Sequence, residues 1–315
     1  MVRIAYLGPE GTFTEAALLQ LAAAGMVPDH GPATVRRVPS ESTPAALDAV
    51  RDGVVDYACV PIENSIEGPV VPTLDSLAMG SPLQVFAETT LDVAFSIVVK
   101  PGRTVADVRT VAAFPMAAAQ VRHWLATHLP VAELRPANSN ADAAQQVADG
   151  QVDAAVSSAL AAHHCGLTAL ADGVVDEPNA RTRFLLVGPP GPPPPRTGAD
   201  RTSVVLRIHN TPGALVAALS EFGIRGIDLT RIESRPTRTE LGAYMFFLDC
   251  VGHIDDDAVA EALKALHRRC ADVRYLGSWP TGVLAGAQPP PCDEAARWLA
   301  RLREGKPDPA GGTAQ

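Results

Sequence analysis

The chain has 315 residues, a length typical of about two domains, and it is 47% hydrophobic although only 5% aromatic. It carries 26 Lys and Arg against 35 Asp and Glu, a net charge of −9, so we expect neither nucleic acid nor an anionic membrane as a partner. The five cysteines are scattered, and the N-terminus lacks the features of a signal peptide. We therefore expect reduced thiols in a cytoplasmic protein.

The first 188 residues alternate strand and helix signals. A strand is predicted over Val2–Leu7 and a helix over Glu15–Ala24. A second helix begins at Thr43-Pro44, a cap residue followed by proline, and ends near Gly53. A strand over Val54–Val60 follows. This alternation predicts an α/β domain with largely parallel strands.

An internal repeat divides this segment. The pattern Ala-x-x-x-Val-x-Asp-Gly-x-Val-Asp-x-Ala at residues 46–58 recurs at residues 143–155. Either two similar α/β lobes face a cleft, or the copies share only a common helix–Gly–strand pattern. In the first case the loops after the two strands, residues 61–65 and 157–158, form opposite walls of one site, because open α/β sheets bind ligands beyond the carboxyl ends of strands.

The proline-rich run from Gly188 to Pro195 predicts a semi-rigid linker, which we place at residues 189–202. Residues 203–280 follow the order strand, helix, strand, strand, helix, strand, which is typical of a ferredoxin-like βαββαβ domain. The tail, residues 281–315, contains a predicted short helix at Asp293–Arg303.

Two motifs of the first domain carry candidate chemistry, and each has a plain structural alternative. The turn Gly8–Thr14 precedes the first helix and either presents free N–H groups to an anion or only caps the helix through Thr12 or Thr14. Asn64 follows a buried strand and a proline, and there its amide either binds a carboxylate or hydroxyl group or only shapes a turn.

Two further residues are ambiguous on their own. Asp142 follows Ser139 at the capping-box spacing, so capping competes with ligand binding, and Thr182 lies at a strand entrance, where Thr is common. His163-His164-Cys165 lacks further ligands at metal-binding spacing, so we expect no metal. Nucleotide, dinucleotide and serine-hydrolase motifs are absent from the sequence.

In the second domain, residues 210–215 cap the first helix and residues 233–236 end the second strand. A helix N-terminus can bind an α-carboxylate, and carbonyl and carboxylate oxygens can bind an α-ammonium group. The alternative is an ordinary turn and a surface ion pair.

Together these motifs are specific, and over residues 1–280 the chain resembles the prephenate dehydratase family followed by an ACT regulatory domain. The resemblance rests on their order: Gly8–Thr14, Val60–Ser65, Thr182–Phe184, Gly213–Val216 and Glu233–Pro236. It implies a two-lobed catalytic domain over residues 1–188, like a type 2 periplasmic binding protein. Lobe 1 is expected at residues 1–77 and 166–188, lobe 2 at residues 78–165, and the ACT domain at residues 203–280.

The resemblance implies a carbon–oxygen lyase that converts prephenate to phenylpyruvate, water and CO₂ in L-phenylalanine biosynthesis. It implies no metal or organic cofactor. L-Phenylalanine is expected to bind between ACT domains as a feedback inhibitor, which requires a homodimer or homotetramer.

By position, the resemblance makes Thr182 the catalytic residue. The implied substrate-binding residues are Thr12, Thr14, Asn64, Ser65, Gln120, Asp142, Ser158, Arg183 and Phe184. The implied L-phenylalanine-binding residues are Asn210, Gly213, Ala214, Leu215, Glu233, Ser234 and Arg235.

The sequence departs from the family pattern in three places. Phe114-Pro115-Met116 replaces a His-Pro-Gln segment, Asp142 replaces a glutamate, and Asn179 lies three residues before Thr182 instead of two. The first change argues against substrate contacts, beyond Gln120, from the helix predicted over Met116–Leu125.

Three alternatives remain open: arogenate dehydratase, a solute-binding protein of the same two-lobed fold, and an ATP phosphoribosyltransferase. The charge poses a separate question, because residues 1–202 carry 13 Lys and Arg against 21 Asp and Glu, a net −8, and the expected substrate is a dianion. We therefore expect helix termini and neutral side chains to bind it.

Overall fold

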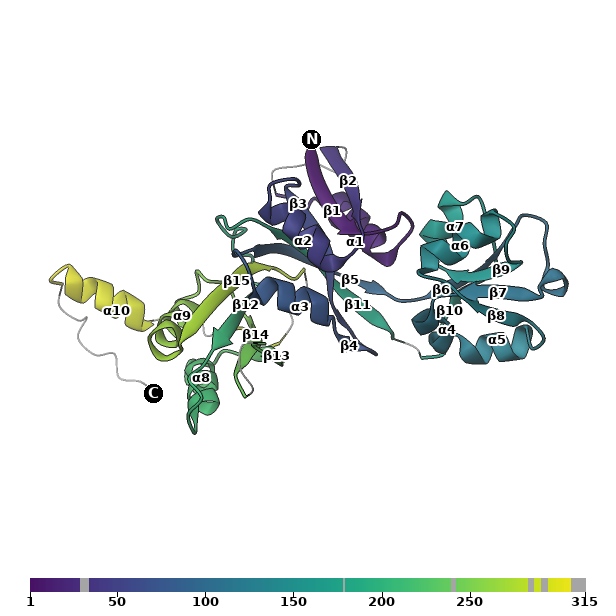
Figure 1. Ribbon diagram of the computed structural model, residues 1–315. Helices are drawn as coiled ribbons and strands as arrows, with labels where there is room; N and C mark the ends of the chain where they lie inside the picture. Colours follow the sequence, from purple (N-terminus) through teal and green to yellow (C-terminus); the bar gives the residue numbers. More distant parts are fainter. Residues whose placement is uncertain (29–33, 178, 239–241, 283–285, 290–293, 307–315) are drawn as a thin grey trace, which may run out of the picture. The chain divides into compact units, whose positions relative to one another are not determined.

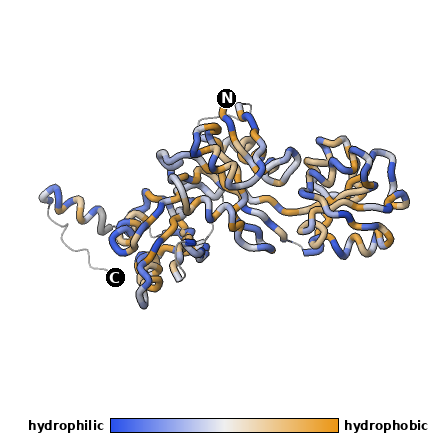
Figure 2. The backbone as a smooth tube through the Cα atoms, in the orientation of Figure 1, coloured by the Kyte–Doolittle hydropathy of each residue, from blue (hydrophilic) through white to orange (hydrophobic). Residues whose placement is uncertain are grey.

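The structure is a computed structural model that describes residues 1–28, 34–177, 179–238, 242–282, 286–289 and 294–306. The chain divides into two compact units, Met1–Gly191 and Pro192–Gln315. Figure 1 shows strands assembled into sheets with helices packed against them, and Figure 2 shows apolar residues concentrated along the strands. The mixed α/β fold confirms the predicted class.

The first sheet of unit 1 has the order β2-β1-β3-β11-β5, with the short β4 paired to β3. Its strands are β1 (Val2–Leu7), β2 (Val35–Ser40), β3 (Tyr57–Asn64), β4 (Gly68–Pro69), β5 (Gln84–Asp92) and β11 (Arg181–Gly188). Strands β2, β1 and β3 run parallel, whereas β11 is antiparallel to β3 and β5. Its helices are α1 (Phe13–Ala23), α2 (Thr43–Arg51) and α3 (Val71–Ala78).

The second sheet of unit 1 has the order β10-β6-β9-β7-β8. Its strands are β6 (Phe95–Val99), β7 (Thr110–Ala113), β8 (Glu133–Pro136), β9 (Ala154–Ser157) and β10 (Thr168–Val174). Its helices are η2 (Val105–Asp107, a 3₁₀ turn), α4 (Pro115–Gln120), α5 (Arg122–His128), α6 (Asn140–Ala148) and α7 (Ala159–His164). Each sheet has its own apolar cores, and Phe13 packs against a core of each sheet.

The chain passes from one lobe to the other at positions that differ from those expected from the sequence, residues 77–78 and 165–166. Strand β5 still belongs to the first sheet, because it pairs along β11, and β10 still belongs to the second, because it pairs with β6. The chain therefore crosses between the sheets at Val93–Ala94 and again between β10 and β11. The Val93 N–H donates to the Ala180 carbonyl at 2.7 Å, which joins the two crossings.

The two copies of the repeat fold alike, one in each sheet. The first copy forms α2, Gly53 and β3, and the second forms α6, Gly150 and β9. Both glycines have positive φ, +69° and +76°, a conformation that glycine adopts without strain. This local likeness agrees with the two-lobe interpretation of the repeat.

Unit 2 has a four-stranded antiparallel sheet of order β13-β14-β12-β15, and one helix follows β12 and another follows β14, as the ferredoxin-like pattern predicts. Its strands are β12 (Asp200–Arg207), β13 (Leu229–Pro236), β14 (Tyr244–Val251) and β15 (Asp272–Pro280). Its helices are α8 (Ala214–Gly223), α9 (Asp257–Arg269) and the tail helix α10 (Glu294–Arg303). The predicted start of the tail helix, Asp293, lies outside the described residues.

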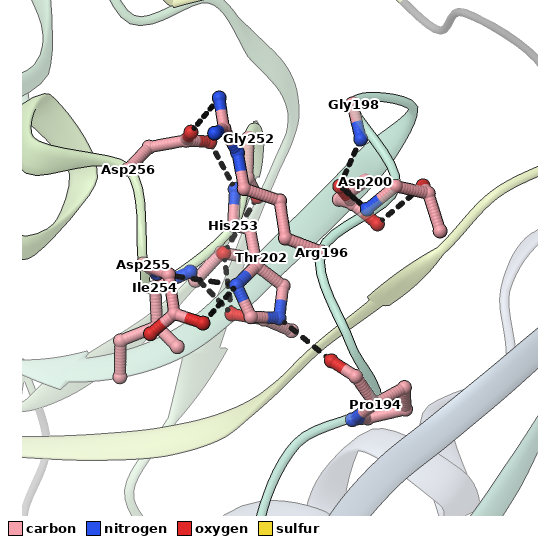
Figure 3. A network of polar contacts seen from close by, with 12 residues as sticks. Pro194, Arg196, Gly198, Asp200, Thr202, Gly252, His253, Ile254, Asp255 and Asp256 are labelled. Atoms are coloured by element: carbon pink, nitrogen blue, oxygen red, sulfur yellow. Dashed lines mark hydrogen bonds and ion pairs between the residues drawn. The ribbon is translucent and has the colours of Figure 1, made fainter. Parts of the chain in front are cut away.

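Polar contacts attach the proline-rich segment to unit 2 (Figure 3). The buried His253 donates through Nε2 to the Pro194 carbonyl at 3.0 Å, and Arg196 pairs with Asp256 at 2.6 Å. The Asp200 carboxylate accepts hydrogen bonds from Thr197 and Gly198, and β12 begins there. The last three residues of the expected linker, 200–202, are therefore strand, because their backbone pairs with β14 and β15.

Candidate active site

Thr182 and Asn64 lie opposite each other where β11 begins and β3 ends. The Asn64 Nδ2 atom donates a hydrogen bond of 2.8 Å to the Thr182 Oγ1 atom. Thr182 is 9% exposed. Because its oxygen accepts this bond, the hydroxyl proton of Thr182 stays available to donate to another group.

The orientation of the Asn64 amide is fixed by a turn. Its Oδ1 atom accepts hydrogen bonds from the backbone N–H groups of Ile66 at 2.8 Å and Glu67 at 2.9 Å. With the oxygen held in this Asx turn, the NH₂ group is directed at Thr182. Ser65 completes the junction: its hydroxyl donates to the Asn179 carbonyl at 3.2 Å and accepts from the Arg181 N–H at 2.8 Å. Ser65 therefore joins the ends of β3 and β11.

Arg183 and Phe184, which follow Thr182, interact with other side chains of the protein. The Arg183 guanidinium is 12% exposed and lies between two carboxylates, Glu63 at 3.1 Å and Glu88 at 3.4 Å. Phe184 is 2% exposed within the core beneath α1. The structure therefore gives Arg183 to an internal ion-pair network and Phe184 to the core, and it does not bring either into the cleft described below.

The Gly8–Thr14 turn begins α1, and Thr12 is the N-cap. The Thr12 hydroxyl accepts from the Glu15 N–H at 3.3 Å and donates to the Leu7 carbonyl at 2.9 Å. Glu15 is fully buried, accepts from the Gly11 N–H at 2.6 Å and pairs with Arg37. Thr12 thus serves as a cap, and the buried carboxylate holds the turn in place.

The same turn contacts the second lobe through Ser158. The Ser158 hydroxyl is buried, donates to the Gly11 carbonyl at 2.6 Å and accepts from the Ala161 N–H at 3.0 Å as the N-cap of α7. Gly11 has φ +88°, and a Cβ there would meet the backbone of Ala161 at 2.8 Å. The repeat predicts that Ser158 faces the loop at residues 61–65 across a site. In the structure the Ser158 hydroxyl instead bonds the Gly8–Thr14 turn.

A cleft of about 670 Å³ lies between the two lobes of unit 1. Its lining comes from residues 7–9, 12–14, 39–41, 114, 138–140 and 142. The N-termini of α1 and α6 both contribute, and no Lys or Arg lines it in the described part of the chain. Among the predicted residues it gathers Thr12, Thr14 and Asp142. No described residue forms a hydrogen bond with the Thr14 hydroxyl, which leaves that group available to a ligand.

The cleft and the Thr182–Asn64 pair lie at the same edge of the first sheet. The cleft begins at the carboxyl end of β1, and Asn64 lies at the carboxyl end of β3, which is the parallel neighbour of β1. Ligands of open α/β sheets bind at this edge. Asn64, Ser65 and Thr182 are not among the cleft-lining residues, so the predicted site residues form two groups.

Asp142 and Gln120 have contrasting environments. The Asp142 carboxylate accepts from the Asn138 N–H at 2.8 Å and from the Gln146 amide at 3.3 Å, and the Ser139 hydroxyl caps the Asp142 N–H at 3.0 Å. The Ser139 cap and the bond from Asn138 to Asp142 therefore fix the N-terminus of α6, while Asp142 also lines the cleft. Gln120 is 9% exposed, and its Oε1 atom is buried without a donor among the described residues.

Several cleft residues are not among the site residues predicted from the sequence, for example Glu41, Phe114, Asn138 and Asn140. Phe114 had drawn attention only as a departure from the family pattern. Asn138 and Asn140 flank Ser139, and the capping signal of Ser139 hid them. Polar residues on either side of an N-cap, in the loop after a strand's carboxyl end, are the pattern that would have found them.

Unit 2 contains a second cavity, of about 440 Å³. Asn210, Gly213, Ala214 and Leu215 line it together with residues 207–209 and 242–244. Gly213 is the N-cap of α8 in the left-handed conformation, with φ +79°. The other predicted effector residues, Glu233, Ser234 and Arg235, lie on β13, an edge strand, and do not line this cavity.

The described residues contain neither a metal-binding cluster nor a membrane-spanning helix. They contain no group of three or more His, Cys, Asp and Glu side chains arranged to hold a metal ion. None of their helices is long and apolar enough to span a bilayer. Cys59, Cys165, Cys250 and Cys270 are free thiols, and burial raises the pKa of the Cys59 thiol well above its ordinary value. Cys292 lies outside the described residues.

Comparisons with known proteins agree with the site. The family model described as prephenate dehydratase matches residues 4–191, and the ACT domain model matches residues 202–268. A curated prephenate dehydratase of Mycobacterium tuberculosis is 80% identical over 308 residues, which covers 98% of this chain and 96% of that protein. One from Mycobacterium leprae is 78% identical over 312 residues, which covers 98% and 97%.

Among solved structures, the prephenate dehydratase of Arthrobacter aurescens in complex with L-Phe is 41% identical, with a TM-score of 0.85. The match covers 96% of this chain and 98% of that one. Matches of this extent over both units show that the chain belongs to the prephenate dehydratase family.

Proposed function

We propose that this chain is a prephenate dehydratase, a carbon–oxygen lyase that converts prephenate to phenylpyruvate, water and CO₂. The observation that carries the proposal is the bond from Asn64 to Thr182, which leaves a hydroxyl proton ready to be donated. Loss of CO₂ sends the electron pair of the broken C–C bond into the ring. The ring becomes aromatic as the hydroxyl on the opposite carbon departs.

In this reaction Thr182 is the group that assists the departing hydroxyl. The Thr182 O–H donates its hydrogen bond to that oxygen, which leaves as water once protonated, and Thr182 regains a proton from solvent. A free threonine hydroxyl is a weak acid, and the Asn64 donor on its oxygen stabilises the negative charge that develops there.

We propose that neutral donors of the cleft bind the two carboxylates of the substrate. The N-termini of α1 and α6 bring partial positive charge from opposite lobes, and the Thr14 hydroxyl adds a donor. Arg183 is already neutralised by Glu63 and Glu88. These donors support the proposal that the cleft binds a dianion without a basic side chain of its own.

The direct test is turnover of purified protein with prephenate and, separately, with arogenate, which has an amino group where prephenate has a ketone. We expect phenylpyruvate from prephenate. Formation of phenylalanine from arogenate at a higher kcat/KM would make the chain an arogenate dehydratase instead. Turnover of neither would refute the dehydratase proposal.

Substitution of Asn64 tests its link to Thr182. We expect Asn64→Ala to lower kcat about tenfold or more, with a smaller change in KM, because the bond to Thr182 is lost. Asn64→Asp keeps the acceptor for the turn but removes the donor, so its kcat should fall at least as far. A normal kcat in Asn64→Asp would exclude this role.

We also propose that L-phenylalanine is the feedback inhibitor and binds the cavity of unit 2. Support comes from the L-Phe complex of the Arthrobacter relative and from the α8 N-terminus, which can bind an α-carboxylate. Asn210 lies beside it. We propose that Glu233, Ser234 and Arg235 reach the effector from a second copy, in a homodimer or homotetramer. The free thiols support a cytoplasmic location.

Calorimetry and inhibition assays test the effector site. We expect L-phenylalanine to bind and inhibit the wild type, and Asn210→Ala to raise the inhibitory concentration about tenfold without changing the uninhibited rate. Ser220→Ala is the matched control, because Ser220 lies on the same helix outside the cavity and its hydroxyl donates to the Val216 carbonyl. Absence of L-phenylalanine binding to the wild type would remove the proposal.

A further inference from the structure

The cleft of unit 1 contains an amide side chain, that of Asn140, which forms no hydrogen bond with any described residue. Asn140 is the first residue of α6 and lines the cleft opposite Thr12 and Thr14. Its Oδ1 atom is fully buried and has no donor among the described residues. Its amide nitrogen also has no hydrogen-bond partner in the described part of the chain, but it is not buried.

A buried acceptor without a donor destabilises the folded state, because its bonds to water are lost and not replaced. An alanine at this position would avoid that cost. Residues that lower stability in this way are common where binding requires them. The free NH₂ group beside the cleft is therefore the part of Asn140 that a ligand can use.

The backbone of Asn140 is held firmly. Its carbonyl accepts from the Ser157 hydroxyl at 2.5 Å, and Ser157 is fully buried in β9. One residue earlier, Ser139 is the N-cap of α6 and bonds the Asp142 N–H at 3.0 Å. The amide therefore projects from a fixed position, which is what a preorganised binding group requires.

The chemistry of the ligand follows from the proposed function, on which this inference rests. Prephenate has two carboxylates and a keto oxygen, all acceptors, and a single hydroxyl donor. No Lys or Arg lines the cleft in the described part of the chain, so N–H donors of other kinds must bind these oxygens. We propose that Asn140 is a substrate-binding residue whose NH₂ group donates a hydrogen bond to a carboxylate of the substrate.

The test compares steady-state kinetics and thermal unfolding of Asn140→Ala with the wild type. We expect KM for prephenate to rise about tenfold or more, because a hydrogen bond to a charged group is lost, with kcat changed less than about threefold. The melting temperature should stay the same or rise, since the unpaired Oδ1 atom is removed. A purely structural residue would give the opposite pair of results, an unchanged KM and a lower melting temperature.

Two further variants complete the design. Asn140→Asp keeps the shape but replaces the donor with a negative charge, so KM should rise further than in Asn140→Ala. Gln145→Ala is the matched control on the exposed side of α6, outside the cleft, and should keep the wild-type KM. If the wild type turns over prephenate and both Asn140 variants keep its KM within twofold, the role of Asn140 is refuted alone. If the wild type does not turn over prephenate, the proposed function and this inference fall together.

Discussion

Thr182→Ala is expected to lower kcat for prephenate by about 10²–10⁴-fold, the range for loss of a positioned proton donor. The substitution removes the only hydroxyl that Asn64 is seen to bond, so the departing oxygen loses its donor and Asn64 loses its acceptor. KM should change little, because the proposed binding groups for the substrate carboxylates line the cleft and Thr182 does not. Stopped-flow or steady-state assays at saturating prephenate measure this directly.

Thr182→Ser is the matched variant, because it keeps the hydroxyl and removes only a methyl group. It should retain at least about a tenth of the wild-type kcat. A well-folded Thr182→Ala enzyme that loses less than tenfold in kcat would exclude Thr182 as the donor. Circular dichroism and the melting temperature show whether the variant is folded.

The second large effect is expected at Gly11. In Gly11→Ala, an alanine would have to adopt a backbone φ of +88°. Its new Cβ atom would also lie 2.8 Å from the Ala161 backbone. We expect a loss of about 2–4 kcal/mol in the free energy of unfolding, from backbone strain and overpacking together. Because the turn carries Thr12 and Thr14 into the cleft, kcat/KM should fall as well.

Gly25→Ala separates the two causes. Gly25 also has positive φ, +67°, but a Cβ there would meet nothing within 4 Å. This control should lose only about 1 kcal/mol and keep normal kinetics. Denaturant unfolding of both variants measures the difference. Equal losses at the two positions would mean that the contact between Gly11 and α7 contributes no stability.

Local signals predicted much of the fold because local chemistry decides it. Strand β1 has its predicted bounds, and α1 is capped by Thr12, one of the two expected caps, so it begins at Phe13, two residues before the predicted start. At α2 the cap is Ser42 rather than Thr43, since Ser42 bonds the Ala45 N–H at 3.2 Å. Strand β3 runs on to Asn64 although Pro61 suggested an end, because distant β11 supplies the pairing.

The site was only partly accessible from the sequence. Thr182 and Asn64 are 118 residues apart, so only the family resemblance could name both, and only the sheet register shows that they bond each other. Membership of a motif does not place a side chain in the cleft: Phe184 is a core residue, and Arg183 is held by Glu63 and Glu88. Tertiary packing, which no local pattern encodes, decides which side chains of a motif reach a cleft.

The lack of Lys and Arg among the described cleft residues has a consequence for selectivity among cellular anions. A basic pocket attracts every phosphate and nucleotide, since unit charges act at a distance and with little regard to shape. A domain with a net charge of −8 over residues 1–202 repels such polyanions instead. Dipoles at helix ends and amide groups act only at contact, so an anion must match their positions before it gains any attraction. The negative charge therefore disfavours phosphate compounds at long range, whereas the proposed dicarboxylate substrate gains its attraction at contact in the cleft.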